Sequence, residues 1–184
     1  MKLSHIILGI VLLAVILMIA IYNKLVRHRT LMQEAWSGID VYLKKRHDLV
    51  PALVATVKAY AVHERQTFED VIRLRSNAMD AKNRSERIET EKGLGAALGR
   101  MMLFSENYPD LKANVNFLTL QHQLADLEEE LSLSRRYYNG TVRELNIRMD
   151  SFPSNIVAGM FGFEKGVFFE IGKSERQIEL KIEN

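Results

Sequence analysis

The sequence predicts an all-α protein, in which an N-terminal transmembrane helix precedes an elongated antiparallel bundle of about four helices with coiled-coil-like packing. Three observations predict it: an uncharged apolar run at the N-terminus, apolar residues at helical spacing through most of the remainder, and only 3 Pro and 10 Gly in 184 residues. The 47% of apolar residues is enough for a packed core. The predicted limits are 3–23 for the anchor, 24–150 for the bundle and 151–184 for a C-terminal flap and tail.

Charge and cysteine content exclude several functional classes. The chain has 25 Lys and Arg against 23 Asp and Glu, a formal net charge of +2. Such a balance gives no electrostatic footprint for nucleic acid, so we expect no nucleic-acid partner. Cysteine is absent, which excludes disulfides, thiolate metal sites, a cysteine nucleophile and a lipid-modified cysteine.

The anchor is predicted from residues 3–23, which carry no formal charge. About 20 apolar residues span the hydrocarbon core of a bilayer as one helix. The alternative, a cleaved signal peptide, fits less well because the apolar run is long and Met18 occupies the −3 position of the best cleavage site, after Ala20. Lys24, Arg27 and Arg29 follow the run, whereas only Lys2 precedes it. The positive-inside rule then favours a cytoplasmic body and an external N-terminus, with a periplasmic body as the alternative.

The first helix of the bundle is predicted over 30–62 and could continue the anchor as a single helix. Its apolar face consists of Trp36, Ile39, Leu43, Val50, Leu53, Val57 and Tyr60. Pro51 lies within this pattern and predicts a kink or a restart. Arg46 falls on the apolar face, where it would either extend its charged end to solvent or form a buried ion pair with a carboxylate of another helix.

Two further helices are predicted over 63–79 and 85–106. Residues 80–91 are highly charged with alternating signs, which predicts a surface turn and a solvated start of the second helix. Glycines at 93, 95 and 99 predict a small-residue helix face that permits close packing, because their spacing does not fit a dinucleotide-binding loop.

A fourth helix is predicted from Pro109, which suits a first helical position, to about Met149. Apolar residues recur here every seven positions, at Phe117, Leu124, Leu131, Tyr138 and Leu145. A sustained heptad predicts coiled-coil-like packing of this helix.

The last 35 residues change character, with four phenylalanines among glycines: Phe161, Phe163, Phe168 and Phe169. This pattern has two interpretations. The segment could be a hydrophobic flap over one end of the bundle, or an aromatic patch for a partner or for the bilayer surface. Residues 173–184 are expected to form an exposed tail.

We find no arrangement of residues that predicts catalysis, a cofactor or a metal. No Glu has a His three residues later, no two of the five His are four residues apart, and no phosphate-binding loop motif is present. His47 and Asp48 are adjacent on a helix and therefore point about 100° apart, the wrong geometry for a hydrolytic triad. We therefore predict a protein that is not an enzyme and has no small-molecule substrate.

Several ordered sequence runs resemble the LemA family of bacterial membrane proteins. The runs are 22–26 (YNKLV), 34–41 (EAWSGIDV), 43–51 (LKKRHDLVP), 60–61 and 63–64 (YA, HE), 106–114 (ENYPDLKAN), 135–139 (RRYYN) and 168–170 (FFE). The resemblance covers about 22–170; residues 171–184 do not look like the family's usual short tail. It implies a single N-terminal anchor in the bacterial inner membrane, a helical bundle in the cytoplasm and no established enzymatic activity. It also implies an association with envelope proteins such as membrane proteases.

The leading functional prediction is a membrane-anchored scaffold or adaptor that self-assembles as a homo-oligomer. The alternative is a component of an oligomeric pore or transport assembly, although residues 3–22 carry almost no polar stripe. Besides the lipid bilayer, three candidate interaction surfaces are predicted, a helix face, a corner and an aromatic cluster. Their residues are, in that order, Trp36, Asp40, Arg46 and Asp48; Tyr108 and Asp110; and Phe161, Phe163, Phe168 and Phe169.

Overall fold

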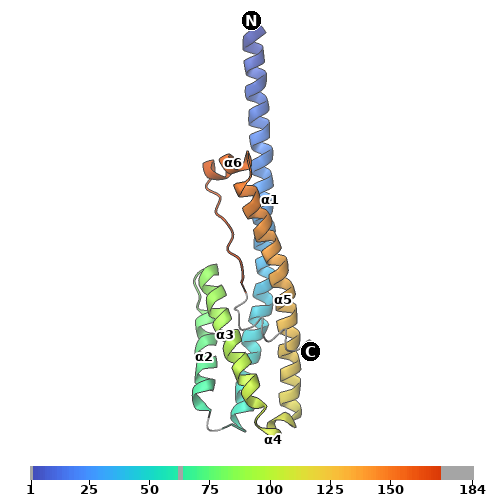
Figure 1. Ribbon diagram of the computed structural model, residues 1–184, viewed down its shortest axis with the longest axis vertical. Helices are drawn as coiled ribbons and strands as arrows, with labels where there is room; N and C mark the ends of the chain where they lie inside the picture. The colour runs from blue at the N-terminus through green and yellow to red at the C-terminus, as the bar shows by residue number, and fades with distance from the viewer. Residues whose placement is uncertain (1, 62–63, 171–184) are drawn as a thin grey trace. The chain divides into compact units, whose positions relative to one another are not determined.

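The computed structural model describes residues 2–61 and 64–170, and within them it contains six helices and no strand (Figure 1). The helices are α1 (Lys2–Lys58), α2 (Arg65–Met79), α3 (Arg84–Ser105), α4 (Pro109–Lys112), α5 (Val115–Asp150) and α6 (Ser154–Met160). The all-α prediction is confirmed. His63 and the exposed tail predicted over 173–184 lie outside the described residues.

Helix α1 runs without interruption for 57 residues, so the apolar N-terminal segment and the first helix of the bundle are one helix, as expected. The predicted restart at Pro51 is wrong, because the proline lies inside α1. Pro51 has no N–H, which leaves the carbonyl of His47 without its usual donor four residues later. Arg75 Nε of α2 donates to that carbonyl over 2.7 Å, and this bond satisfies the acceptor that the proline leaves free.

The chain divides into two compact units, and helices α1 and α5 contribute to both. Unit 1 comprises Met1–Gly38 and Arg135–Phe168. Unit 2 comprises Ile39–Ser134 and Phe169–Asn184, of which the structure describes residues up to 170.

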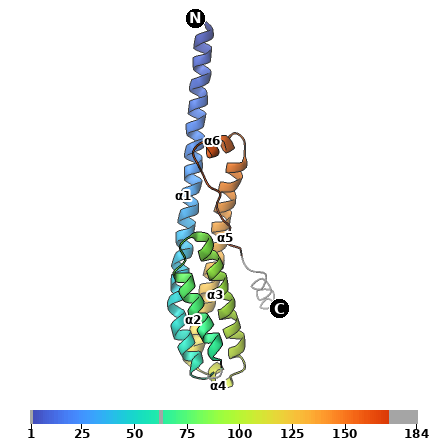
Figure 2. The ribbon, with the colours of Figure 1, turned by 90° about the vertical axis from the view of Figure 1, so that its left-hand side faces the viewer.

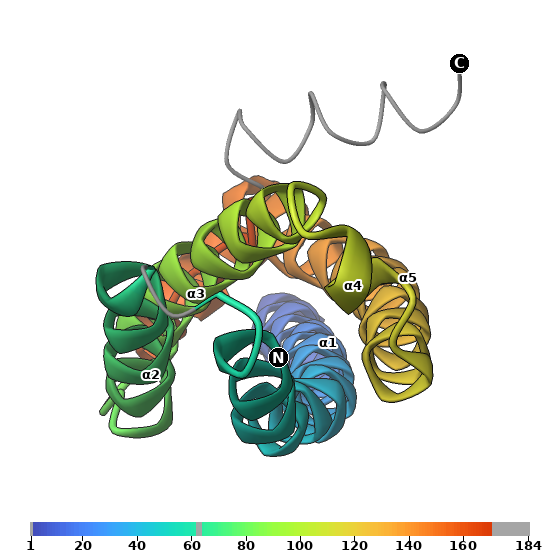
Figure 3. The ribbon, with the colours of Figure 1, turned by 90° about the horizontal axis from the view of Figure 1, so that it is seen from below.

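Unit 2 is an antiparallel arrangement of the second part of α1, helices α2 and α3, and the first part of α5, with α4 as a short link before α5 (Figures 1 and 3). Leucine, valine, alanine and aromatic side chains from all five elements form one core. Its buried members include Val50, Leu53, Val57, Phe68, Val71, Leu94, Leu98, Met101, Leu111, Phe117 and Leu124. Helices α2 and α3 approach closely at Gly93, where a Cβ atom would lie 3.3 Å from Leu74 Cδ2. The predicted small-residue packing face is therefore confirmed at Gly93.

The predicted single helix from Pro109 to Met149 is in fact two helices, α4 and α5, separated by Ala113 and Asn114. The break has a local cause. Asn114 caps α5, because its Oδ1 accepts a hydrogen bond from the Phe117 N–H at 3.0 Å. Its Nδ2 also donates to the Tyr60 hydroxyl at 2.8 Å.

The heptad residues of α5 are buried along the whole helix. In unit 2 these are Phe117, Leu124 and Leu131, and in unit 1 they are Tyr138 and Leu145. The seven-residue period therefore identified the buried face correctly.

Unit 1 combines the first part of α1, the end of α5, helix α6 and an extended segment over 161–168. Helix α6 lies beside α1 (Figures 1 and 2). Its Val157 and Ala158 pack with Leu25 of α1 in a small core that Met18, Ile21 and Tyr22 border. Gly162 adopts a φ of 64°, a left-handed conformation that favours glycine and turns the chain out of α6.

Candidate interaction surfaces

A cluster of charged side chains lies in the interior of unit 2, at the position where the sequence left two alternatives for Arg46. Arg46 Nη2 lies 2.5 Å from Glu91 Oε2 of α3, and Nη1 lies 2.7 Å from Glu128 Oε1 of α5. Arg46 Nη2 also donates to the backbone carbonyl of Glu91 at 3.3 Å. The Arg46 side chain is 3% exposed, so the buried ion pair is the correct alternative.

His47 joins the same cluster from the next position of α1. Its Nε2 lies 2.8 Å from Glu91 Oε1, although neither atom has a hydrogen bond of good geometry. Arg87 reaches the cluster from α3, with Nε 3.7 Å from Glu91 Oε1 and Nη2 3.8 Å from Asp40 Oδ1. The cluster therefore ties α1, α3 and α5 together through charges rather than through apolar contacts.

The opposite charges of the cluster offset the cost of burying each other in the ionised form. Burial alone would raise the pKa of Glu91, but the adjacent His47 and the charge of Arg46 outweigh it and lower this pKa. Burial alone would lower the pKa of Arg46, but Glu128 and Glu91 outweigh it and raise this pKa. Both side chains are therefore ionised, and each depends on the other remaining charged.

The structure changes the predicted helix face around these residues. Arg46 is buried and therefore does not present its side chain to a partner, which corrects that part of the prediction. Asp40 is half-buried beside Arg87, whereas Asp48 is exposed. At the predicted corner, Tyr108 packs against the core of unit 2 and Asp110 is exposed in the first turn of α4.

Aromatic residues gather in unit 1 where α6 meets α1. The Tyr22 ring lies 4.8 Å from the ring of Phe161 and 5.7 Å from that of Phe163, measured between centroids. The Arg29 guanidinium lies 5.2 Å from the centre of the Phe163 ring, a cation–π distance. An aromatic group with a cation beside it is typical of the interface between lipid and water.

The extended segment 161–168 is fastened to α5 by hydrogen bonds. The Tyr138 hydroxyl donates to the Val167 carbonyl at 2.7 Å. The Asn146 amide exchanges two bonds with Gly166, accepting from its N–H at 2.9 Å and donating to its carbonyl at 3.1 Å.

Side-chain packing completes the attachment of this segment. A Cβ at Gly166 would lie 2.5 Å from the sulfur of Met32 and 3.2 Å from Val142 Cγ1, so any larger residue would require these side chains to move. Trp36 of α1 is half-buried and packs edge-on against Tyr138, with ring centroids 5.3 Å apart.

The four C-terminal phenylalanines have different environments, so neither interpretation of the segment covers all of them. Phe161 is 51% exposed, Phe163 is half-buried and Phe168 is 38% exposed. Phe169 is only 2% exposed, so its place on a predicted interaction surface is wrong.

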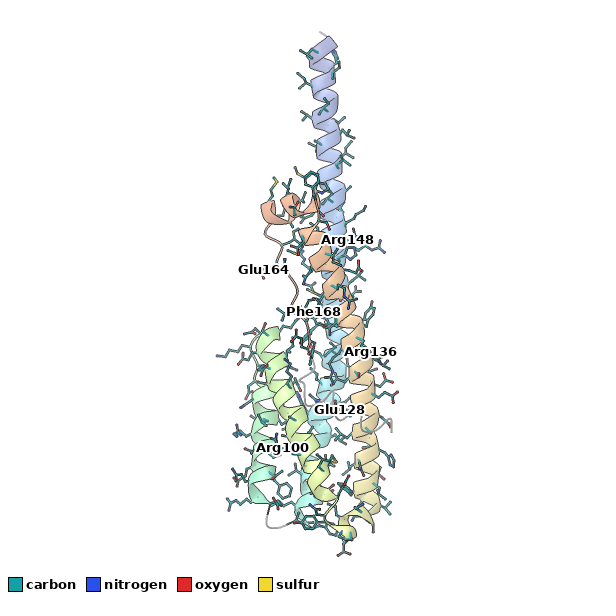
Figure 4. All side chains as sticks on the ribbon, viewed as in Figure 1. Arg100, Glu128, Arg136, Arg148, Glu164 and Phe168 are labelled. Carbon is teal, nitrogen blue, oxygen red and sulfur yellow. The ribbon has the colours of Figure 1, made fainter. Side chains whose placement is uncertain are left out.

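A shallow basic groove of about 450 Å³ also lies in unit 1, between α1 and α5. Its lining includes His28 and Leu31 of α1 with Arg136, Tyr137 and Arg143 of α5. Burial and the nearby Arg148 lower the pKa of His28. Figure 4 shows Arg136 and Arg148 on this part of α5, and Glu144 of the same helix also lines the groove.

The apolar run itself is uncovered. Its large side chains from Leu3 to Ile19 are 46–71% exposed, apart from Met18, which is half-buried against the α6 core. Within the described residues, α1 is the one helix that is long and apolar enough to cross a membrane. Among the residues that the structure describes, no group of three metal-binding side chains occurs.

Comparisons with known proteins identify the family. The model of the LemA family matches residues 35–183, which is most of the chain. The chain belongs to the LemA family. Because this match extends to residue 183, the expectation that the family likeness stops at residue 170 is wrong.

Two kinds of relative are similar to this LemA-family chain. Protein LemA of Metamycoplasma hominis is 24% identical over 155 residues, which cover 84% of this chain and 71% of that protein. Magnetosome protein MamQ 2 of Paramagnetospirillum magneticum is 30% identical over 78 residues, covering 42% of this chain and 29% of that protein. Magnetosome protein MamQ of Magnetospirillum gryphiswaldense is 27% identical over 77 residues. None of these names is that of an enzyme.

The partners of Arg46 are the residues that sequence reasoning missed. Glu91 was assigned to a solvated stretch, although it is 1% exposed. The sequence did contain a signal: Glu91 lies three residues after Ile88 and three before Leu94, and both of these apolar residues of α3 are buried, so Glu91 shares their helix face. Arg75, which interrupts the apolar pattern of α2, also faces inward, to the His47 carbonyl.

Proposed function

We propose that this LemA-family protein is a non-enzymatic scaffold or adaptor of the bacterial inner membrane, held there by the apolar part of α1. One observation carries the proposal: the uncovered apolar segment and the first helix of the bundle are a single helix of 57 residues. No flexible connection separates the bilayer-spanning residues from those that build unit 1. A surface on the bundle would therefore be presented next to the membrane, which suits assembly rather than free diffusion.

The charge asymmetry around the anchor supports a cytoplasmic body with the N-terminus outside. Three cationic residues, Lys24, Arg27 and Arg29, follow the apolar run, and Lys2 alone precedes it. A reporter fused after Asn184 tests this orientation. Fluorescence of a cytoplasmic reporter supports it, and activity of a periplasmic phosphatase fusion contradicts it.

Self-assembly is the second part of the proposal, because several anchors side by side give avidity without any strong single contact. The test is the mass of the full-length protein extracted in mild detergent, measured over a range of concentrations. A discrete oligomer supports a self-assembling scaffold. A monomer at every concentration contradicts self-assembly and leaves an adaptor that binds a different protein, such as an envelope protease.

The anchor is tested by replacing Leu12 and Ile16 together with Arg. Each central Arg costs about 2.5–3.5 kcal/mol on insertion scales, so we expect much of the variant to leave the membrane fraction in alkaline wash. The matched control replaces Val41 and Leu103, which are exposed in unit 2, with Arg. The control should remain membrane-bound like the wild type. Equal extraction of both variants would contradict the anchor.

A further inference from the structure

The region around α6 carries an exposed apolar surface that the anchor alone does not explain. We call residues 152–161 the α6 segment. One side of it is covered, because Val157 and Ala158 pack on α1. Four other large side chains of the segment are uncovered: Phe152 is 80% exposed, Ile156 53%, Met160 62% and Phe161 51%.

Two of these uncovered side chains share one helix face, and the other two lie next to the ends of that helix. Ile156 and Met160 are four residues apart in α6 and therefore share one face of the helix. Phe152 and Phe161 flank the helix at its two ends. An uncovered apolar surface of this kind marks a site of contact with a partner or with lipid.

The position of the α6 segment on α1 points to lipid as the occupant. The α1 residues that border the α6 core are Met18, Ile21 and Tyr22, which are the last residues of the apolar run. Met18 is four residues before Tyr22, so at 1.5 Å per residue it lies about 6 Å deeper along the helix. Interfacial helices bury their apolar face about 5–10 Å into the boundary between headgroups and acyl chains. The α6 segment thus lies at the depth where such a helix belongs.

The charges around the α6 segment fit the same occupant. Lys24, Arg27 and Arg29 follow the apolar run on α1, and Arg143 and Arg148 lie near the end of α5. Tyr22, Phe161 and Phe163 form the aromatic group, and Arg29 lies against its Phe163 ring. From the hydrocarbon outward, membrane proteins typically present apolar residues, then aromatic rings, and then cations that contact anionic lipid headgroups. The side chains around the α6 segment follow this order.

We infer that the α6 segment inserts into the bilayer interface beside the transmembrane part of α1 and contacts lipid through Phe152, Ile156, Met160 and Phe161. The inference rests on the proposed membrane anchor. The α6 segment would be a second attachment to the bilayer, and its residues lie about 130 positions after the anchor in the sequence. The C-terminal end of α5 is thereby held at the membrane surface together with α1.

Because the chain has no cysteine, single cysteines can be introduced and labelled cleanly. The full-length protein is reconstituted in vesicles of phosphatidylethanolamine and phosphatidylglycerol, with an environment-sensitive fluorophore at Ile156→Cys or Met160→Cys. Quenching is measured with lipids that carry a nitroxide near the headgroup or deep in the acyl chain, and with iodide in the water. Val115→Cys, which replaces a 74% exposed apolar residue of unit 2, is the matched control, and Leu12→Cys reports on the anchor.

We expect lipid quenching at Ile156→Cys and Met160→Cys to exceed that at Val115→Cys severalfold, with a matching loss of iodide quenching. Equal iodide quenching at the three sites would overturn the inference. Protection from both quenchers would also overturn it, because a protein surface would then cover α6. In either case, lipid quenching at Leu12→Cys would show that the anchor is still inserted. Absence of lipid quenching at Leu12→Cys would instead overturn the proposed anchor, and the inference with it.

Discussion

Replacing Glu91 with Gln tests whether the buried charges hold unit 2 together. The Glu91 side chain is 0% exposed, with Oε2 2.5 Å from Arg46 and Oε1 2.8 Å from His47. Gln keeps the shape but removes the negative charge, so Arg46 loses one of its two ion pairs and its guanidinium faces a neutral amide instead. Arg46 keeps Glu128, whose side chain is 36% exposed and therefore contributes less. A hydrogen bond to a charged group contributes about 1.5–3 kcal/mol, against about 0.5–1.5 for a neutral one. We therefore expect Glu91→Gln to lower the free energy of unfolding by about 2–3 kcal/mol.

The assay is urea unfolding of the full-length protein in detergent micelles, followed by helical circular dichroism. The matched control is Glu89→Gln on the same helix, where Glu89 is 79% exposed and lies 3.6 Å from Lys92. An exposed pair of this kind contributes less than about 1 kcal/mol. If Glu91→Gln unfolds at the same urea concentration as Glu89→Gln, the reasoning about the buried cluster is refuted.

The difference in unfolding free energy between wild type and Glu91→Gln should depend on pH, in the direction set by the lowered pKa of Glu91. The folded pKa of Glu91 is lowered from its usual value of 4.5, so the unfolded chain binds the proton more readily. The contribution of the ionised carboxylate is therefore fully present above about pH 4.5 and is lost as the pH falls through the lowered folded pKa. The gap in stability between wild type and Glu91→Gln should therefore narrow as the pH falls below 4.5. A gap that widens on acidification would contradict this sign.

Two further substitutions test the close contacts of the chain. Gly166→Ala places a Cβ where the α1 methionine sulfur would be 2.5 Å away, so we expect about 1–3 kcal/mol of destabilisation and faster amide exchange over 161–168. Gly159→Ala is the control, because a Cβ at Gly159 would have no neighbour within 4 Å, and it should leave the amide exchange over 161–168 unchanged. If the two substitutions changed the exchange equally, the packing argument for Gly166 would be refuted. Arg75→Met should cost about 1–3 kcal/mol because it leaves the His47 carbonyl unsatisfied. In a Pro51→Ala background, the new backbone N–H at position 51 can donate to the His47 carbonyl. Arg75→Met should therefore lower the urea midpoint less in this background than in the wild type. Strictly additive effects of the two substitutions would contradict this coupling between Arg75 and position 51.

The sequence predicted the helices and the buried face of α5 because both depend on local periodicity. A residue every seven positions must return to the same side of a helix, and Phe117, Leu131 and Tyr138 are buried as that rule requires. Arg46 could not be resolved in the same way. Its carboxylate partners, Glu91 and Glu128, are 45 and 82 residues away, so only the packed helices decide between a solvated and a paired guanidinium.

The errors at Pro51 and Asn114 have different physical origins. A proline within a helix was expected to restart it, because the free carbonyl would need a donor. That donor comes from Arg75 on another helix, a tertiary contact that no local pattern encodes. Asn114, by contrast, was a readable signal, since an Asn just before a periodic apolar run is a typical N-cap.

The C-terminal segment shows why a hydrophobic composition alone could not choose between a flap and a lipid-facing patch. Val157 and Ala158 are covered by α1, whereas Ile156 and Met160, their neighbours in the same helix, are not. Which residues are covered depends on contacts with α1, more than 100 positions earlier in the chain, and the composition of residues 151–170 is the same for either outcome. Once the covered side is known, the uncovered side lies beside the end of the apolar run. The two interpretations then describe opposite faces of one short helix: one face packs on the anchor, and under our inference the other contacts the lipid around it.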